Sequence, residues 1–580
     1  MTGLPLSRHI GIPDAGNILM MPGSILCYFS RRQPSWSGIM AHSDVQDRLG
    51  RVLDLLVPAA GIGASVAAAL SMGQSADWDQ RNYHYYAGYA LLHKPLLYDF
   101  APAQVQSFFN PLFHVPSYLL LAHLPTRATA AILAALQGMN IWLIYRISKK
   151  LFAGIGSAPC TILSIACAAA AFYGAANLAE LGTTFGDNLI SLFPLAAVLL
   201  LVDHVGIGAA QGRRGRWRMG AAGGLVGLAC GLKLTTAIYA VSLAVMLGLL
   251  AVLARIRVRD AARFVVAAAI GFALTYGYWG LALEREFGNP VFPYLNNVFR
   301  SEMYPHENTM DARFLPRDWS QRLFYPFYFV RENTLVSELP FRDWRFAACY
   351  VLVAALAITR AMRAFGRRKT EDPDAGSQCS GACLFLLAGF MVFSYVLWQG
   401  LFSIYRYAAA LEFLAPVFIV SALLYLIRRR VVAVAVSLAL LGMICRQMSP
   451  MDFGRVPFGD AMLKVSPPPW PGLARSLVIM GGEEATAYIV PSFPATTRFV
   501  RIQANWLYPG LNANLDRRIA SLLRGYAPDR RLVYLSSKGE MAVVAPALAY
   551  FGLGVDADSC APLGAAWGDA GYLCRASPGP

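Results

Sequence analysis

The sequence predicts an all-α polytopic membrane bundle of about eleven transmembrane helices, followed by a small C-terminal α/β domain. Two observations predict this fold class. The 580-residue chain is 56% hydrophobic and only 14% charged, whereas soluble domains carry about 25% charged residues. Apolar runs of about 17–25 residues, the length that crosses a bilayer, also recur through the first 446 residues. This composition excludes an ordinary soluble protein and makes the lipid bilayer the first expected partner.

The positive charge of the chain is distributed between the apolar runs. Fifty basic and 34 acidic residues give a net charge of +16. The basic residues form short clusters that separate apolar runs, which is the positive-inside pattern of cytoplasmic loops rather than the continuous stripe of a nucleic-acid binder. We therefore expect no nucleic-acid partner, a cytoplasmic N-terminus and an extracytoplasmic C-terminus.

The apolar runs give the expected crossings in order. Nine candidate spans lie near 52–72, 128–146, 158–176, 188–203, 262–281, 345–361, 381–399, 409–427 and 431–446. A further run, 219–254, has basic clusters at both ends and must cross twice, with a break at Gly231–Thr235 that places Lys233 at an outer turn. Residues 111–124 are too short for a span, and we interpret them as a juxtamembrane or re-entrant helix.

Three regions follow from this pattern: a tail at 1–50, a transmembrane domain at 51–446 and an extracytoplasmic domain at 447–580. The tail is interpreted as disordered or as a short cytoplasmic segment. Its apolar patch at 18–29 is short and is followed, not preceded, by basic residues, so it does not indicate a cleavable signal peptide. In the C-terminal domain, β-rich runs alternate with helical patterns at 512–524 and 540–551, which predicts an α/β fold. The predicted strands are 476–480, 486–491, 498–502 and 531–535.

The cysteines point to one disulfide. Cys560 and Cys574 lie in the C-terminal region expected outside the cytoplasm, where a disulfide is the natural interpretation. Cys379 and Cys383 have a CxxxC spacing, but a second pair or histidine partners would be needed for a metal site. No cofactor is assigned from the sequence, and a divalent metal is left open.

The stretch 75–86, directly after the first apolar run, concentrates chemical groups at the outer face. It carries Asp77 and Asp79 and then a tyrosine-rich segment. A helix that begins at Asp79 would place Tyr83 one turn further along the same face, and Lys94-Pro95 would end it. The simpler interpretation is that Asp79 is only an N-cap, whose side chain accepts a hydrogen bond from a backbone N–H of the first turn.

Other outer turns are expected to add charged groups to this face. The turn 177–187 carries Glu180 and Asp187, and the turn 401–408 carries Arg406. Carboxylates could take a proton from a sugar hydroxyl, while Lys233 and Arg406 could hold a phosphate leaving group. The alternatives are that Lys233 snorkels to the interface, that Arg406 pairs with another helix, for example at Glu412, and that Glu180 forms only local hydrogen bonds.

Several motifs resemble one family. The sequence Asp79-Gln-Arg-Asn-Tyr83 is similar to the first outer loop of the GT-C superfamily of polyprenyl-phosphate-dependent glycosyltransferases, especially the branch of protein mannosyltransferases and the lipid A aminoarabinose transferase. Asn110-Pro-Leu-Phe, the position of Asp187 at a span start and the segment 227–235 are also similar to that branch. Asp187, however, is not followed by proline, and the C-terminal domain resembles nothing in it.

The resemblance implies an inverting transferase of the bacterial inner membrane. Asp79 would be the general base, with Asp77 and Asp187 in support. Tyr83, Glu180, Lys233 and Arg406 would contact substrates. The donor would be a polyprenyl-phosphate-linked sugar, and the acceptor a glycan, lipid or protein. Two alternatives stay open: an O-antigen ligase or polymerase, and a transporter or flippase, although repeated halves and mid-membrane charges typical of transporters are not seen in the sequence.

Overall fold

The computed structural model describes residues 37–207, 212–365, 380–459, 463–565 and 568–579. The chain separates into two compact units, with the boundary between Leu49 and Gly50. The predicted N-terminal tail therefore lies largely outside the described residues, as does Cys379 of the CxxxC spacing.

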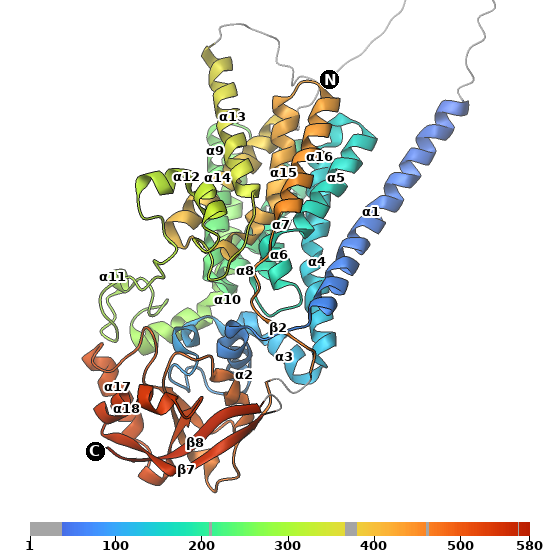
Figure 1. Ribbon diagram of the computed structural model, residues 1–580. Helices are drawn as coiled ribbons and strands as arrows, with labels where there is room; N and C mark the ends of the chain where they lie inside the picture. The colour runs from blue at the N-terminus through green and yellow to red at the C-terminus, as the bar shows by residue number, and fades with distance from the viewer. Residues whose placement is uncertain (1–36, 208–211, 366–379, 460–462, 566–567, 580) are drawn as a thin grey trace, which may run out of the picture. The chain divides into compact units, whose positions relative to one another are not determined.

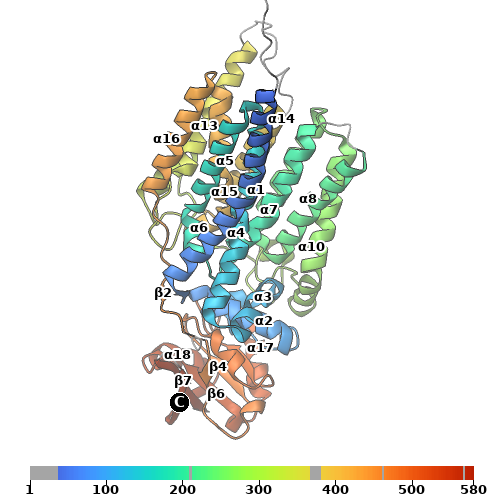
Figure 2. The same ribbon diagram turned by 90° about the vertical axis from the view of Figure 1, so that its right-hand side faces the viewer.

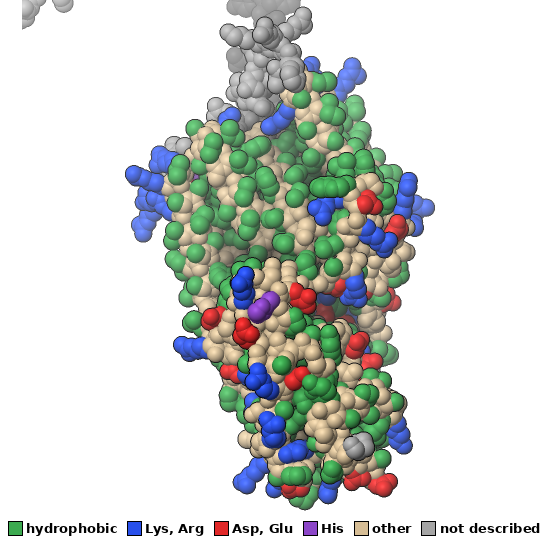
Figure 3. Space-filling view, turned by 90° about the vertical axis from the view of Figure 1, so that its left-hand side faces the viewer, with side chains coloured by type: hydrophobic (Ala, Val, Ile, Leu, Met, Phe, Trp, Pro, Cys, Tyr) green, Lys and Arg blue, Asp and Glu red, His purple; other side chains and the backbone are tan. Residues whose placement is uncertain are grey.

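Nine helices within the described residues are long and apolar enough to cross a membrane. This finding is consistent with a multi-pass membrane protein, and Figure 3 shows hydrophobic side chains over most of the upper part of one face. The nine helices are α1 (Ser37–Met72), α4 (Thr126–Leu151), α7 (Asp187–Ile207), α9 (Ala237–Val252), α10 (Val258–Phe287), α13 (Arg345–Phe365), α14 (Ser380–Leu401), α15 (Ala409–Leu426) and α16 (Arg430–Gln447).

Two further helices correspond to the remaining expected crossings. α5 (Ser157–Phe172) is apolar but has only 16 residues, fewer than the 19 of the span Leu234–Val252 that contains α9. α8 (Arg213–Leu232) begins with four arginines among six residues. The predicted break in the run 219–254 is confirmed, because α8 ends at Leu232 and α9 begins at Ala237, with Lys233 between them. A count of eleven crossings stays a prediction.

Glycines spaced four residues apart bring α8 against α10. A Cβ atom added to Gly227 would lie 2.0 Å from the carbonyl oxygen of Ala268, and one added to Gly223 would lie 2.2 Å from that of Phe264. Small residues at this spacing let two helix backbones approach closely in a membrane. The glycines of the segment 227–235 therefore have a packing role whatever the family of the chain.

Residues 73–127, expected at the outer face and called the first outer segment, fold into short helices at the end of the bundle next to the C-terminal domain (Figure 1). A five-residue π-helix, Gln80–His84, runs into α2 (Tyr85–His93), which ends before Lys94-Pro95 as predicted. The run 111–124 forms a 3-10 turn, Pro111–His114, and the nine-residue helix α3 (Val115–His123). A helix of nine residues is about 14 Å long, which is too short to span a bilayer.

The C-terminal region is an α/β domain with one six-stranded mixed sheet of order β3-β7-β8-β6-β4-β5. β4 pairs in parallel with β5 and β6, while β8 pairs antiparallel with β6 and β7. The strands are β3 (Val465–Ser466), β4 (Leu477–Met480), β5 (Arg498–Arg501), β6 (Arg531–Leu535), β7 (Leu553–Ala565) and β8 (Gly568–Pro578), with the helices α17 (Ala513–Arg524) and α18 (Glu540–Tyr550).

Most of the predicted elements of this domain are present, but one is wrong. The expected strand at 486–491 is a 3-10 helix, Ala487–Ser492, which contains Pro491. Proline lacks the N–H that a central strand must donate, which accounts for the difference. The long hairpin of β7 and β8 was not predicted, because its glycine, aspartate and serine residues obscure the alternation of a strand.

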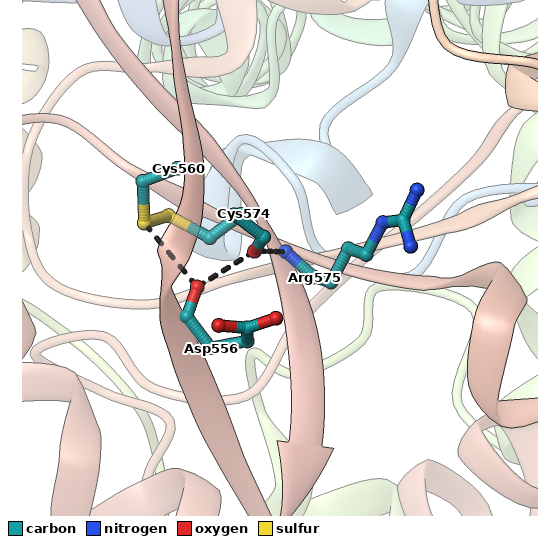
Figure 4. Close-up of a disulfide and its surroundings, with 5 residues drawn as sticks. Asp556, Cys560, Cys574 and Arg575 are labelled. Carbon is teal, nitrogen blue, oxygen red and sulfur yellow. Dashed lines mark hydrogen bonds between the residues drawn. A yellow bond between two sulfur atoms is a disulfide. The ribbon is translucent and has the colours of Figure 1, made fainter.

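The predicted disulfide joins this hairpin. The Sγ atoms of Cys560 and Cys574 are bonded across β7 and β8, and Figure 4 shows the two side chains lying between the neighbouring strands. The pairing of these two cysteines is therefore confirmed in the structure.

The C-terminal domain shares its hydrophobic core with the first outer segment, and Figure 2 shows α2 and α3 next to this domain. Phe100 lies beside Val500 of β5 as an additional parallel bridge, so the segment extends one edge of the sheet. Next to this bridge, the buried Lys94 ammonium donates to both Asp99 carboxylate oxygens at 2.9 and 2.8 Å and to the carbonyl of Thr497 at 2.9 Å. The domain is thus packed onto the segment that carries Asp77 and Asp79.

A second connection comes from the linker after α16. Strand β2 (Arg455–Val456) pairs antiparallel with β1 (Gln74–Ser75), immediately before Asp77. The Arg455 guanidinium donates to the carbonyl oxygens of Ala179 and Leu181, both at 2.9 Å. The linker therefore holds the first and second outer turns together.

Candidate functional site

The candidate site lies at the end of the bundle that faces the C-terminal domain. The helices α1, α4, α7 and α8 fix this position, since α1 and α8 end there and α4 and α7 begin there. Four of the predicted site residues form two ion pairs at this end, from four different segments of the chain. The two pairs are Asp79 with Arg406 and Asp187 with Lys233.

The first pair joins the first outer segment to the turn before α15. Arg406 Nη1 donates to Asp79 Oδ2 at 2.6 Å, and the two side chains are only 12% and 11% exposed. The turn that carries Arg406 is a 3-10 segment, Tyr405–Ala408, at the start of α15. The suggested partner Glu412 is wrong, because Glu412 lies 3.8 Å from the buried guanidinium of Arg345 instead.

Asp79 is not a helix cap. Its backbone is helical and its side chain forms no capping hydrogen bond. Asp77 has that role, since its Oδ1 accepts from the backbone N–H of Gln80 at 2.7 Å. The simpler interpretation of Asp79 is therefore wrong, and its carboxylate is directed at a cation from another helix.

The Asp77 carboxyl is enclosed on all sides. Besides Gln80, the hydroxyl of Ser75 donates to its second oxygen. Burial, and next the charge of Asp79, raise the pKa of Asp77 from 3.8 to about 6. Asp77 thus holds the start of the π-helix and is close enough to Asp79 for the two charges to repel each other.

The second pair joins the start of α7 to the break between α8 and α9. Lys233 Nζ donates to Asp187 Oδ1 at 2.5 Å, with the ammonium side chain 19% exposed and the carboxylate 3% exposed. Lys233 therefore does not snorkel freely, because an acidic side chain fixes its ammonium group.

One aromatic ring connects the two pairs. The Tyr407 ring lies 5.3 Å from Lys233 Nζ and 5.4 Å from the Arg406 guanidinium carbon, while Phe185 lies 5.0 Å from the same guanidinium. All three distances are in the range of cation–π interactions. Two cations and two carboxylates thus surround a single tyrosine at the mouth of the bundle.

Some buried polar atoms of this cluster have no hydrogen-bond partner within the described residues. They are Arg406 Nε and Asp187 Oδ2, one donor and one acceptor. A buried polar atom without a partner costs about 1–3 kcal/mol, so such atoms indicate where a bound group would form hydrogen bonds. The cluster can therefore offer a guanidinium N–H to an anion and a carboxylate oxygen to a hydroxyl.

Tyr83 and Glu180 lie at the edge of the cluster. Burial and the charge of Asp79 raise the pKa of Tyr83 well above its usual value, so its hydroxyl is a neutral group. Glu180 accepts from the backbone N–H of Asn188 at 2.9 Å, and burial and Asp187 raise its pKa well above the usual range. The local hydrogen bond expected for Glu180 is present.

Two histidines were missed by the sequence-based reasoning. His84 and His114 are stacked with ring centroids 4.7 Å apart, and His84 Nδ1 lies 2.8 Å from the hydroxyl of Thr184. Burial, with further contributions from nearby charges, holds the pKa of each imidazole well below the usual value, so both rings are neutral. The available signal was that His84 follows Tyr83 and that His114 follows the Asn110-Pro-Leu-Phe segment.

The described residues offer no cluster suited to a metal ion. Within the described part of the chain, no three His, Cys, Asp or Glu side chains converge as a metal-binding group. Asp77, Asp79 and Asp187 instead accept hydrogen bonds from Gln80, Arg406 and Lys233, respectively.

Comparison with known proteins does not place the chain in a family. No family model matches the sequence, and no functionally curated protein matches it. The candidate site is therefore interpreted from its own residues.

Proposed function

We propose that the chain is a membrane glycosyltransferase of the GT-C type, which moves a sugar from a polyprenyl-phosphate carrier to an acceptor hydroxyl at the face of the C-terminal domain. The observation that carries the proposal is the pair of carboxylate–cation contacts around Tyr407. This transfer needs a proton acceptor and a phosphate-binding cation near one carbon atom, and Asp79, Asp187, Arg406 and Lys233 supply both within one cluster.

The two ion pairs hold the cations and carboxylates of the site in position before a substrate binds. Arg406 now donates to the Asp79 oxygen that would take a proton. When a donor phosphate accepts from Arg406 and Lys233, it competes with the two carboxylates for these cations. Phosphate binding would thereby release a carboxylate oxygen at the moment that the leaving group is in place.

The reaction then follows from these roles. The acceptor hydroxyl oxygen attacks the sugar carbon that carries the phosphate, while its proton passes to Asp79. The bond between that carbon and the phosphate oxygen breaks, and the electron pair leaves on the polyprenyl phosphate. Arg406 and Lys233 balance the added negative charge. Attack opposite the leaving group inverts the configuration at the sugar carbon.

The test is Asp79→Asn, expressed in cells that lack the native protein, with mass spectrometry of the cell-envelope glycans. Loss of a general base lowers transfer by roughly 100-fold or more, so the product glycan should disappear. Asp77→Asn should retain more product, because asparagine still caps the π-helix. The matched control is Glu284→Gln, an exposed acidic residue on α10. A wild-type glycan profile with Asp79→Asn would reject Asp79 as the base.

A further inference from the structure

A charged hollow lies at the end of the bundle opposite the candidate site. It has a volume of about 440 Å³. Its walls come from Asp54 in the middle of α1, the last turns of α4 with Ala153 after it, and the end of α7. Asp203 follows Asp187 by 16 residues of α7, which is about 24 Å along the helix.

Basic side chains outnumber acidic ones around this hollow. Arg146, Lys149 and Lys150 occupy one face of α4, with Asp54 and Asp203 opposite them. Arg218 of α8 approaches Asp203 at 3.9 Å. Four cations against two carboxylates leave a surplus of two positive charges, while Ala153, Val202 and Gly206 give part of the wall an uncharged surface.

The two carboxylates are already engaged. Asp54 accepts from the hydroxyl of Tyr145 at 2.7 Å and lies 3.7 Å from Lys149 Nζ, and Asp203 lies 2.5 Å from Lys150 Nζ. These contacts orient the two lysines. Arg146 is exposed and has no ion-pair partner within the described residues. Its guanidinium is therefore the group most available to a new anion.

We propose that this hollow binds the phosphate headgroup of an anionic membrane phospholipid. Basic hollows between membrane helices suit such headgroups because the lipid supplies the phosphate beside the lysines and arginines and an acyl chain beside the apolar surface. The neighbouring face of α1 is exposed and apolar, with Leu55 75% exposed and Leu56 57% exposed. An acyl chain of the bound lipid would cover this face.

The proposal is tested on the purified full chain by counting retained lipid with native mass spectrometry. The probes are dioleoyl phosphatidylglycerol, dioleoyl phosphatidylcholine and inorganic phosphate. Each basic residue near a charged headgroup contributes about fivefold in affinity. Arg146→Ala should therefore reduce phosphatidylglycerol retention about fivefold, and Arg146→Lys should restore most of it. Phosphatidylcholine should be retained weakly by every variant.

The matched control is Arg428→Ala, which removes one exposed arginine from the same end of the bundle but outside the hollow. It should retain phosphatidylglycerol as the unmodified chain does. Equal losses with Arg146→Ala and Arg428→Ala would mean that only the general positive charge acts, and the site would be rejected. Equal retention of the two lipids, no loss with Arg146→Ala, or binding of inorganic phosphate alone would overturn the proposal as well.

Discussion

The contact between Asp79 and Arg406 leads to a quantitative prediction. Both side chains are about nine-tenths buried, and their atoms lie 2.6 Å apart. A pair on the surface would contribute about 0–1 kcal/mol, whereas removing one partner of a buried pair costs about 3–5 kcal/mol. Asparagine keeps one acceptor for the guanidinium, so Asp79→Asn should cost about 2–3 kcal/mol of the free energy of unfolding.

A double-mutant cycle isolates the interaction of the pair. Asp79→Asn, Arg406→Gln and their combination would be unfolded with urea in detergent micelles and followed by tryptophan fluorescence. Because each single change leaves a charge without its partner, the double variant should be more stable than the sum of the single changes predicts. The coupling energy should be about 1.5–3 kcal/mol, as for hydrogen bonds between charged groups.

The control cycle combines Asp79→Asn with Arg428→Ala at the other end of the bundle. Changes at distant sites add within about 0.3–0.5 kcal/mol, so this cycle should show no coupling. A coupling below about 0.5 kcal/mol between Asp79 and Arg406 would refute the pair as a defined contact, and with it the argument that a donor phosphate competes for Arg406.

Three other predictions concern stability. The bond between Cys560 and Cys574 closes a loop with a sequence separation of 14. Replacing both cysteines with serine should therefore destabilise the C-terminal domain by about 3 kcal/mol. Labelling of these two thiols before reduction would contradict the bond. The pKa of Asp77 is raised to about 6, so this carboxyl should make the free energy of unfolding fall by about 2–4 kcal/mol as the pH rises from 4 to 7. In Asp77→Asn, the free energy of unfolding should depend less on pH over this range. The same pH dependence in Asp77→Asn and the unmodified chain would refute the shift. Arg345 is 1% exposed and donates to Asp343 at 2.8 Å. Arg345→Ala should therefore lower the free energy of unfolding by about 3–5 kcal/mol. A thermal midpoint equal to that of the unmodified chain would argue against this buried contact.

The parts of the fold that follow from local patterns could be predicted from the sequence. Apolar length predicted the long helices, and the basic residues on both sides of 219–254 predicted the break at Lys233. Proline after Lys94 predicted the end of α2. In the C-terminal domain, the strand at 486–491 was predicted wrongly, because its apolar residues outweighed the signal of Pro491.

The partners of the charged residues could not be predicted in the same way. Asp79 and Arg406 are 327 residues apart in sequence, and no local spacing records such a contact. Asp77 and Asp79 are also separated by a single residue, so the sequence could not show which one caps the helix. The buried His84 and His114 stack for a similar reason, since tertiary packing alone brings their rings together.

The pairing of β1 with β2 makes the candidate site depend on the order of synthesis. Arg455 donates to the carbonyl of Gly73 across 382 residues of sequence, and Arg406 reaches Asp79 across 327. During translation the first outer segment must therefore wait until nearly the whole bundle and the linker have been made. A chain truncated before Arg406 would lack both the partner of Asp79 and the strand β2 that pairs with β1. The early part of the chain thus carries the carboxylates, and the site forms only after the later part, which carries Arg406 and Arg455, has been made.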